Sequence, residues 1–209
     1  MIRGGLAGSC FQMDDTFTAY TVDRIVESGI DAAKAMFRLD LTRTDSLKTL
    51  TACATAIDAC TDRGIPMHLE ALPVERSDSG YQVIKTTEAL IQTIGVASGL
   101  GKSFLNTWIK IPYCEGFSDV ARSTTCPILM LSGESSGDPT RIFQEFSSGM
   151  VAGANIRGAL VGRNVHHRGG HDRAAVAAAV YAVELRPKAT PDVIAREHLA
   201  NLDALTRLF

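Results

Sequence analysis

Five short apolar segments alternate with segments of helical character, and this alternation restricts the fold more than any other feature of the chain. The expected strands cover residues 33–41, 66–72, 103–112, 127–132 and 156–161. The expected helices cover residues 21–28, 45–63, 84–98, 118–123, 138–152 and 172–184. Because the connections are short, this pattern predicts parallel strands joined by right-handed crossovers. The polar segment 74–82 is expected to form a loop.

In the first three expected strands, polar and apolar residues alternate, so each strand has one polar face and one apolar face. The polar faces contain Lys34, Arg38 and Asp40 in the first strand, His68 and Glu70 in the second, and Asn106, Trp108 and Lys110 in the third. Polar residues gathered on one side of a parallel sheet favour a barrel with a reactive mouth over a doubly wound sheet. The nucleotide-binding pattern GxGxxG does not occur in the sequence. We therefore expect an α/β protein of the (β/α)8 TIM-barrel type.

Composition restricts the class of protein further. The chain has 209 residues, of which 45% are hydrophobic, and its net charge is -2, values that are typical of one soluble domain. It contains no basic patch for nucleic acid or an anionic membrane, and no apolar stretch near the roughly 18 residues of a membrane span. The first residues lack the apolar core of a signal peptide. We expect a single cytoplasmic domain over residues 1–209, in which residues 187–209 form a C-terminal helical extension.

Lys110 stands among apolar residues in the segment Ser-Phe-Leu-Asn-Thr-Trp-Ile-Lys-Ile-Pro. A buried ammonium group loses its water, so either a partner compensates its charge or its pKa falls toward neutrality. A neutral lysine amine is the nucleophile that a Schiff base requires. In the alternative interpretation, Lys110 lies at the strand end and extends its ammonium group into solvent. The sequence of this strand alone leaves both interpretations open.

Glycine-containing segments follow the last two expected strands. Ser132 and Gly133 come directly after one strand, and Gly162 and Arg163 come after the other. Each segment alone is more often a simple turn. Together, small residues leave backbone N–H groups accessible to an anion, and Arg163 adds a positive charge. Because barrels frequently bind phosphate at the loops after strands 7 and 8, these four residues predict a phosphate site.

Three runs of the sequence, WIKIPY, PILMLSGESSGDP and GALVGRNV, resemble the class I aldolase family that joins deoxyribose-phosphate aldolases to archaeal-type fructose-bisphosphate aldolases. The N-terminal run RGGLAGSCFQMDDTFTAY is similar to an actinobacterial branch of the latter, so the resemblance extends from residue 3 to about residue 184. It implies a (β/α)8 barrel in which Lys110 forms a Schiff base with the substrate ketone. It also implies that Ser132, Gly133, Gly162 and Arg163 bind the substrate phosphate, and that no cofactor or metal is needed.

Further catalytic roles fall on polar residues of the first two expected strands. An amine must be neutral to attack a carbonyl, and Arg38 or Lys34 would lower the pKa of Lys110 by like-charge repulsion. Glu70 is the candidate acid and base, because its face points to the same mouth as Lys110. The alternative role of Glu70 is an ion pair with Arg38 or Lys34 that orders the barrel interior. Asp40 is expected to hold Arg38.

The chain departs from the family pattern in two respects. Glu70 and Leu72 stand where the family has an aromatic pair that includes a tyrosine used in proton transfer. A full barrel takes about 250 residues, whereas the resemblance begins only at the end of the family's third strand. We therefore expect a partial barrel that lacks the first two to three strands. The aspartate on strand 1 that the family uses in catalysis is then also missing. Either a misplaced start codon removed them, or a second copy closes the sheet, and we expect a homo-oligomer.

The segment HHRGGH contains His166, His167 and His171, whose spacing fits no standard structural zinc site. We expect these histidines in the loop after the last strand and expect no metal.

Together with these features, the resemblance implies a class I aldolase that cleaves or forms a C–C bond in a phosphorylated ketose of the fructose-1,6-bisphosphate type. Its expected partner is a small phosphorylated sugar, and neither nucleic acid nor a membrane is expected. The alternatives are a deoxyribose-phosphate or tagatose-bisphosphate aldolase, and a non-catalytic, phosphate-binding remnant of a barrel.

Overall fold

The computed structural model describes residues 2–3, 17–133, 139–167, 170 and 172–185. The strands are β1 (Ile2–Arg3), β2 (Phe17–Ala19), β3 (Ala33–Leu39), β4 (Met67–Ser77), β5 (Gly80–Val83), β6 (Thr107–Pro112), β7 (Ile128–Leu131) and β8 (Ile156–Leu160). The α-helices are α1 (Val22–Glu27), α2 (Leu47–Asp62), α3 (Thr87–Ser98), α4 (Phe117–Arg122), α5 (Thr140–Met150), α6 (Arg163–His166) and α7 (Arg173–Leu185). The expected C-terminal helix at 187–209 lies outside the described residues.

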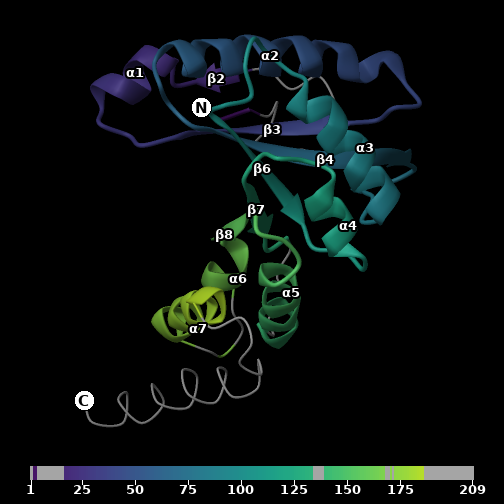
Figure 1. Ribbon diagram of the computed structural model, residues 1–209, viewed down its shortest axis with the longest axis vertical. Helices are drawn as coiled ribbons and strands as arrows, with labels where there is room; N and C mark the ends of the chain where they lie inside the picture. The colour runs from purple at the N-terminus through teal and green to yellow at the C-terminus, as the bar shows by residue number, and fades with distance from the viewer. Residues whose placement is uncertain (1, 4–16, 134–138, 168–169, 171, 186–209) are drawn as a thin grey trace.

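A six-stranded sheet organises the described part of the chain. Its order is β3-β4-β6-β7-β8, and these five strands are parallel, whereas β5 pairs with β4 in the antiparallel direction. Figure 1 shows α2, α3, α4 and α5 following one another around the twisted sheet in the order of the strands. The prediction of parallel strands connected by helices is therefore confirmed. The closure of the sheet and the number of missing barrel strands stay predictions.

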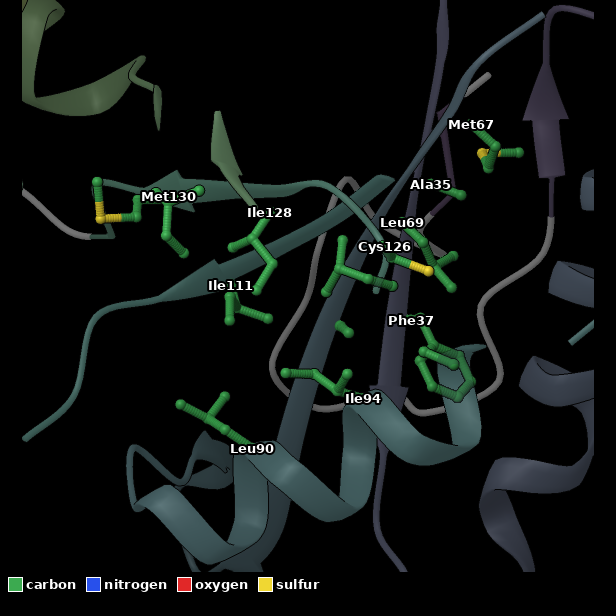
Figure 2. Packing of buried hydrophobic residues seen from close by; sticks show 14 of the residues in the cluster. Ala35, Phe37, Met67, Leu69, Leu90, Ile94, Ile111, Cys126, Ile128 and Met130 are labelled. Atoms are coloured by element: carbon green, nitrogen blue, oxygen red, sulfur yellow. The ribbon is translucent and has the colours of Figure 1, made fainter. Parts of the chain in front are cut away.

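The apolar face of the sheet forms the main core. Ala33, Ala35, Phe37 and Leu39 of β3 are each 3% exposed or less, as the alternation in the sequence predicted. The same alternation buries Leu69 of β4 and Ile109 and Ile111 of β6 completely. Figure 2 shows Leu90 and Ile94 of α3 directed toward the strands that contain Phe37, Leu69 and Ile111. Burial of this face leaves the opposite face of the strands for polar groups.

The prediction of a loop at 74–82 was wrong, because β4 extends to Ser77 and pairs with β5 in a hairpin. Four residue pairs connect the two strands, from Val74 opposite Val83 to Ser77 opposite Gly80. Val74 joins Leu72 and Leu131 in a second, smaller apolar cluster, against which Tyr81 packs. Most side chains of the hairpin are polar, so the sequence lacks the apolar alternation by which a strand is recognised.

Several other element boundaries differ from expectation, two of them by three residues or more. The strand around Lys110 begins at Thr107 rather than at 103, and the exposed Phe104 and Leu105 lie before it. The helix expected from 84 begins at Thr87, because the side chain of Thr86 accepts a hydrogen bond from the backbone N–H of Ala89 and caps the helix there. Neither shift changes the face to which a strand residue belongs.

Among the described residues, no helix combines the length and the hydrophobicity needed to cross a bilayer.

Gly101 precedes β6 and packs against α2 in a conformation with φ of +72°. We expect Gly101→Ala to destabilise the protein more than Gly64→Ala, although Gly64 has a similar φ of +65°. A Cβ atom at position 101 would lie 2.7 Å from Ile57 Cγ2 and 2.8 Å from Asp58 Oδ1, whereas one at position 64 would meet nothing within 4 Å. Left-handed backbone strain costs roughly 1–2 kcal/mol in both variants, and overpacking adds about 1–3 kcal/mol at Gly101. Urea unfolding of both variants measures the difference, and equal losses would contradict the contact with α2.

Candidate active site

A cavity of about 380 Å³ lies on the polar side of the sheet, where β3, β4, β6, β7 and β8 contribute neighbouring side chains. It is lined by Lys34, Met36, Glu70, Lys110, Leu131, Ser132, Gly133, Leu160, Gly162 and Arg163. Lys110, Glu70 and the four residues of the expected phosphate site therefore lie around one cavity, and Lys34 lines it too. Arg38 is the exception.

Parallel register brings three ionisable side chains together. Glu70 of β4 stands opposite Met36 of β3 on one side and opposite Lys110 of β6 on the other. Lys34 lies two residues before Met36, and because side chains alternate along a strand, it shares the same face. Three residues that are far apart in the sequence thus meet across adjacent strands.

Glu70 accepts hydrogen bonds from two lysines through one oxygen atom. Lys110 Nζ lies 3.1 Å from Glu70 Oε2, and Lys34 Nζ forms an ion pair with the same oxygen. The side chains of Lys110 and Glu70 are each 13% exposed, whereas that of Lys34 is 41% exposed. Lys110 therefore does not extend into bulk solvent, and the ion pair that was the alternative role of Glu70 is present, with Lys34 as its partner.

The pKa of Lys110 is lowered from its ordinary value. Burial is the main cause, because the ammonium form loses hydration, and the nearby positive charges of Lys34 and Arg163 act in the same direction. The negative charge and the hydrogen bond of Glu70 oppose this effect without cancelling it. Lys110 consequently has a larger neutral fraction near neutral pH than a lysine in water.

The pKa of Glu70 is also lowered, although burial alone would raise it. The charges and hydrogen bonds of Lys34 and Lys110 outweigh the loss of hydration and stabilise the carboxylate. Glu70 is therefore ionised at neutral pH, and it accepts rather than donates the hydrogen bonds that join it to the two lysines.

The other end of the cavity consists of small residues after β7 and β8. Gly133 has φ of +64°, and a Cβ atom there would meet only Leu131 Cδ1 at 3.9 Å, while one at Gly162 would meet nothing within 4 Å. Ser132 is 8% exposed. Arg163 follows Gly162 and begins α6, so the expected loop around His166 starts with a short helical turn. These residues leave room for a ligand beside a guanidinium group.

Asn164 was not proposed for the site, yet it joins the two glycine loops. Its side-chain Nδ2 donates a hydrogen bond of 2.9 Å to the backbone oxygen of Ser132, and the residue is only 4% exposed. A buried side-chain amide requires hydrogen-bond partners. The asparagine that follows Arg163 in the run Gly-Arg-Asn was therefore a signal from which a structural role could have been predicted. Glu184 of α7 accepts a hydrogen bond of 2.8 Å from the backbone N–H of Ala159 in β8.

Arg38 is 4% exposed and stands opposite Leu72 of β4, two residues farther along β3 than Met36. It does not line the cavity, and Lys34 is the cation of β3 that meets Glu70. Asp40 Oδ1 accepts hydrogen bonds from the backbone N–H and the hydroxyl of Thr42, at 3.0 and 2.6 Å. The geometry therefore favours Lys34 over Arg38 as the residue that influences Lys110.

His171 of the HHRGGH segment lies outside the described residues. In the part of the chain that the structure describes, no three histidine, cysteine, aspartate or glutamate residues come together as metal ligands would.

We expect Glu70→Gln to destabilise the protein by about 1.5 kcal/mol at pH 7, the lower end for hydrogen bonds to charged groups, because Lys34 is partly exposed. The folded-state pKa of Glu70 lies below its ordinary value of 4.5, so its stabilising contribution is present above pH 4.5 and is lost as the pH falls through the folded-state pKa. Urea unfolding from pH 7 to pH 3 should show the two proteins converging toward the acid end. A constant difference at every pH would contradict the ion pair.

Comparison with known proteins adds a family and a fold. A protein-family model described as Cgl0159-like matches residues 1–182. The crystal structure of Cgl0159 from Corynebacterium glutamicum (Brevibacterium flavum) is 29% identical and has a TM-score of 0.71, covering 93% of this chain and 60% of that chain. A comparison with curated proteins finds no match.

Two structures of archaeal fructose-1,6-bisphosphate aldolase are 20% identical to this chain, with TM-scores of 0.63 and 0.58. The first covers 83% of this chain and 64% of the aldolase, and the second covers 74% and 58%. In the second, the catalytic lysine is covalently bound to the carbinolamine intermediate of the substrate. These similarities show an aldolase-like, TIM-barrel-like α/β fold.

The chain spans only about 60% of the length of the Corynebacterium structure. The family model nevertheless matches most of the chain, and this chain therefore belongs to the Cgl0159-like family.

Proposed function

We propose that this chain belongs to a class I aldolase, which forms a Schiff base between Lys110 and a phosphorylated ketose. The observation that supports this most is the position of Lys110, which is largely buried and hydrogen-bonded to Glu70 in a cavity shared with Arg163 and two glycine loops. A nucleophile and a place for an anion thus lie within one cavity. The resemblance of the lysine strand and the glycine loops to the aldolase family agrees with this assignment.

The charges around the cavity favour an anionic substrate. Among the described lining residues, Lys34, Lys110 and Arg163 are basic, and Glu70 is acidic. With Lys110 neutral, these groups leave one excess positive charge, which attracts an anion. A phosphate group is suited to Arg163, because the planar guanidinium donates two parallel hydrogen bonds to its oxygens. Ser132, Gly133 and Gly162 would complete the phosphate site.

The reaction begins when the neutral amine of Lys110 adds to the ketone carbon while the carbonyl oxygen takes up a proton, forming a carbinolamine. Loss of water breaks the C–O bond and leaves an iminium ion. The bond between the α- and β-carbons then breaks, its electron pair moves toward the iminium nitrogen to form an enamine, and the β-hydroxyl loses a proton as the aldehyde departs. Protonation of the enamine and hydrolysis of the resulting iminium regenerate Lys110.

Glu70 is the acid and base in this proposal. Its carboxylate is within hydrogen-bonding distance of Lys110 Nζ, so it can accept a proton near the reacting nitrogen and return it to the departing water. The tyrosine that aldolases of the fructose-bisphosphate type use for proton transfer has no counterpart at Glu70 or Leu72. A fructose-1,6-bisphosphate-type ketose remains the proposed substrate, because the lysine strand and both glycine loops resemble that branch.

Borohydride trapping tests the nucleophile directly. Incubation with millimolar dihydroxyacetone phosphate followed by borohydride should add the mass of the reduced ketose phosphate to Lys110, because reduction converts the imine into a stable amine. Lys110→Met should abolish the adduct, whereas Lys85→Met, which removes an exposed lysine outside the cavity, should leave it unchanged. Peptide mass spectrometry locates the modified residue. The absence of any adduct, or labelling of a different lysine, would overturn the proposal and favour a non-catalytic phosphate-binding module.

The phosphate site is tested by comparing two ketones that differ only in the phosphate. We expect Arg163→Gln to raise the dihydroxyacetone phosphate concentration for half-maximal trapping about 10- to 100-fold relative to that for dihydroxyacetone, since a hydrogen bond to a charged group contributes about 1.5–3 kcal/mol. Taking this ratio cancels any change in the reactivity of Lys110. Arg157→Gln is the matched control, because Arg157 is an exposed arginine of β8 that does not line the cavity. Equal effects on the two ketones would show that Arg163 does not bind phosphate.

A further inference from the structure

Part of the cavity wall is apolar, and this part has no role in the reaction described above. Met36 of β3, Leu131 of β7 and Leu160 of β8 contribute apolar side chains to the lining. Met36 stands opposite Glu70 of β4, and Glu70 stands opposite Lys110 of β6. Because neighbouring strands lie about 4.8 Å apart, the backbones of Met36 and Lys110 are roughly 10 Å apart at the same level of the sheet.

A ketose bound as proposed would lie across the sheet, with its two ends on opposite sides of Lys110. Its phosphate end is expected in the glycine loops after β7 and β8, where Arg163 lies. Because Lys110 is on β6, the carbon atoms on the other side of the ketone must extend toward β4 and β3. Among the described residues of those two strands, the cavity is lined by Lys34, Met36 and Glu70.

Of these three side chains, Met36 is the one that presents an uncharged surface to the carbon chain. Lys34 and Glu70 form an ion pair with each other. The thioether of methionine is only a weak hydrogen-bond acceptor, so Met36 offers little to the hydroxyl groups of a sugar. Its main effect on a bound chain is therefore steric, and it limits how far the chain can extend toward β3.

The position of Met36 is supported from the side of the β4–β5 hairpin. Met36 packs against the apolar cluster of Leu72, Val74 and Leu131, and Tyr81 of β5 packs against the same cluster. Leu131 also lines the cavity, so the cluster joins two parts of the apolar wall. Closely packed side chains leave few voids into which a neighbour can move. A longer substrate chain would therefore meet a supported side chain.

We propose that Met36 is a specificity-determining residue that limits the length of the aldehyde half of the substrate. The inference rests on the proposed function, because only a Schiff base at Lys110 directs the carbon chain toward β3. Ketoses of the fructose-1,6-bisphosphate type have an aldehyde half of three carbon atoms, as in glyceraldehyde 3-phosphate. The four carbon atoms of erythrose 4-phosphate would extend into the space that the Met36 side chain occupies.

Condensation of dihydroxyacetone phosphate with each of these two aldehydes, catalysed by the full chain, tests the limit. The enamine carbon bonds to the aldehyde carbon, the aldehyde oxygen takes up a proton, and water releases the ketose from Lys110. We expect Met36→Ala to raise the ratio of kcat/KM for erythrose 4-phosphate to that for glyceraldehyde 3-phosphate. The expected rise is about tenfold or more, because one carbon unit in an enclosed pocket changes kcat/KM roughly 10- to 200-fold. Met36→Phe should lower the ratio.

Leu160→Ala is the matched control, because it removes an apolar side chain from the β8 side of the same cavity and should leave the ratio unchanged. Met36→Val provides a milder truncation if Met36→Ala does not fold. An unchanged ratio in the truncated variants, or an equal rise in Leu160→Ala, would overturn the role of Met36. So would a borohydride adduct of dihydroxyacetone phosphate without condensation of either aldehyde. The absence of that adduct in the unmodified protein would overturn the proposed function, and the role of Met36 with it.

Discussion

The in-register pairing of β3, β4 and β6 is the constraint on which the candidate site depends. Each strand buries one face against the helices, so its alternate residues must point to the opposite side of the sheet. Parallel pairing then places Glu70 level with Lys110, and Lys34 close enough to reach the same oxygen. A slip of one residue in any of these strands would turn its polar residues into the apolar core. The alternation that buries the apolar core therefore also places the polar residues of the candidate site.

The residues around the cavity are held in place in two ways, some on strands and some on loops. Its lysines and glutamate project from strands, where backbone hydrogen bonds and the core hold their positions. The small residues of the proposed phosphate site follow β7 and β8, and these loops are connected by the hydrogen bond between Asn164 and the backbone of Ser132. The proposed nucleophile, Lys110, thus lies on a strand, whereas the proposed phosphate site lies on loops, so changes in the loops would alter substrate choice without moving Lys110.

Much of the fold could be predicted from the sequence, because the strands have clear alternation and the helices have clear apolar spacing. The hairpin of β4 and β5 could not, since its strands are largely polar and are stabilised by cross-strand pairing and by contacts of Val74 and Tyr81 with a distant cluster. The lysine in an apolar strand and the glycine loops after the last two strands could be noticed from the sequence, and the structure brings them around one cavity, while their roles stay predictions. Arg38 and Lys34 share a face, and sequence alone offers no way to choose between them.

By itself, the sequence determined the alternation of strands and helices, the polar face of each strand and the residue types available for chemistry. These properties depend on local periodicity, which the covalent backbone imposes on neighbouring residues. Only the tertiary structure decided that Lys34 rather than Arg38 meets Glu70, that both lysines use one oxygen, and that Asn164 joins the two loops. Such contacts are formed by residues that are distant in the chain, and strand register and packing decide which side chains come within hydrogen-bonding distance.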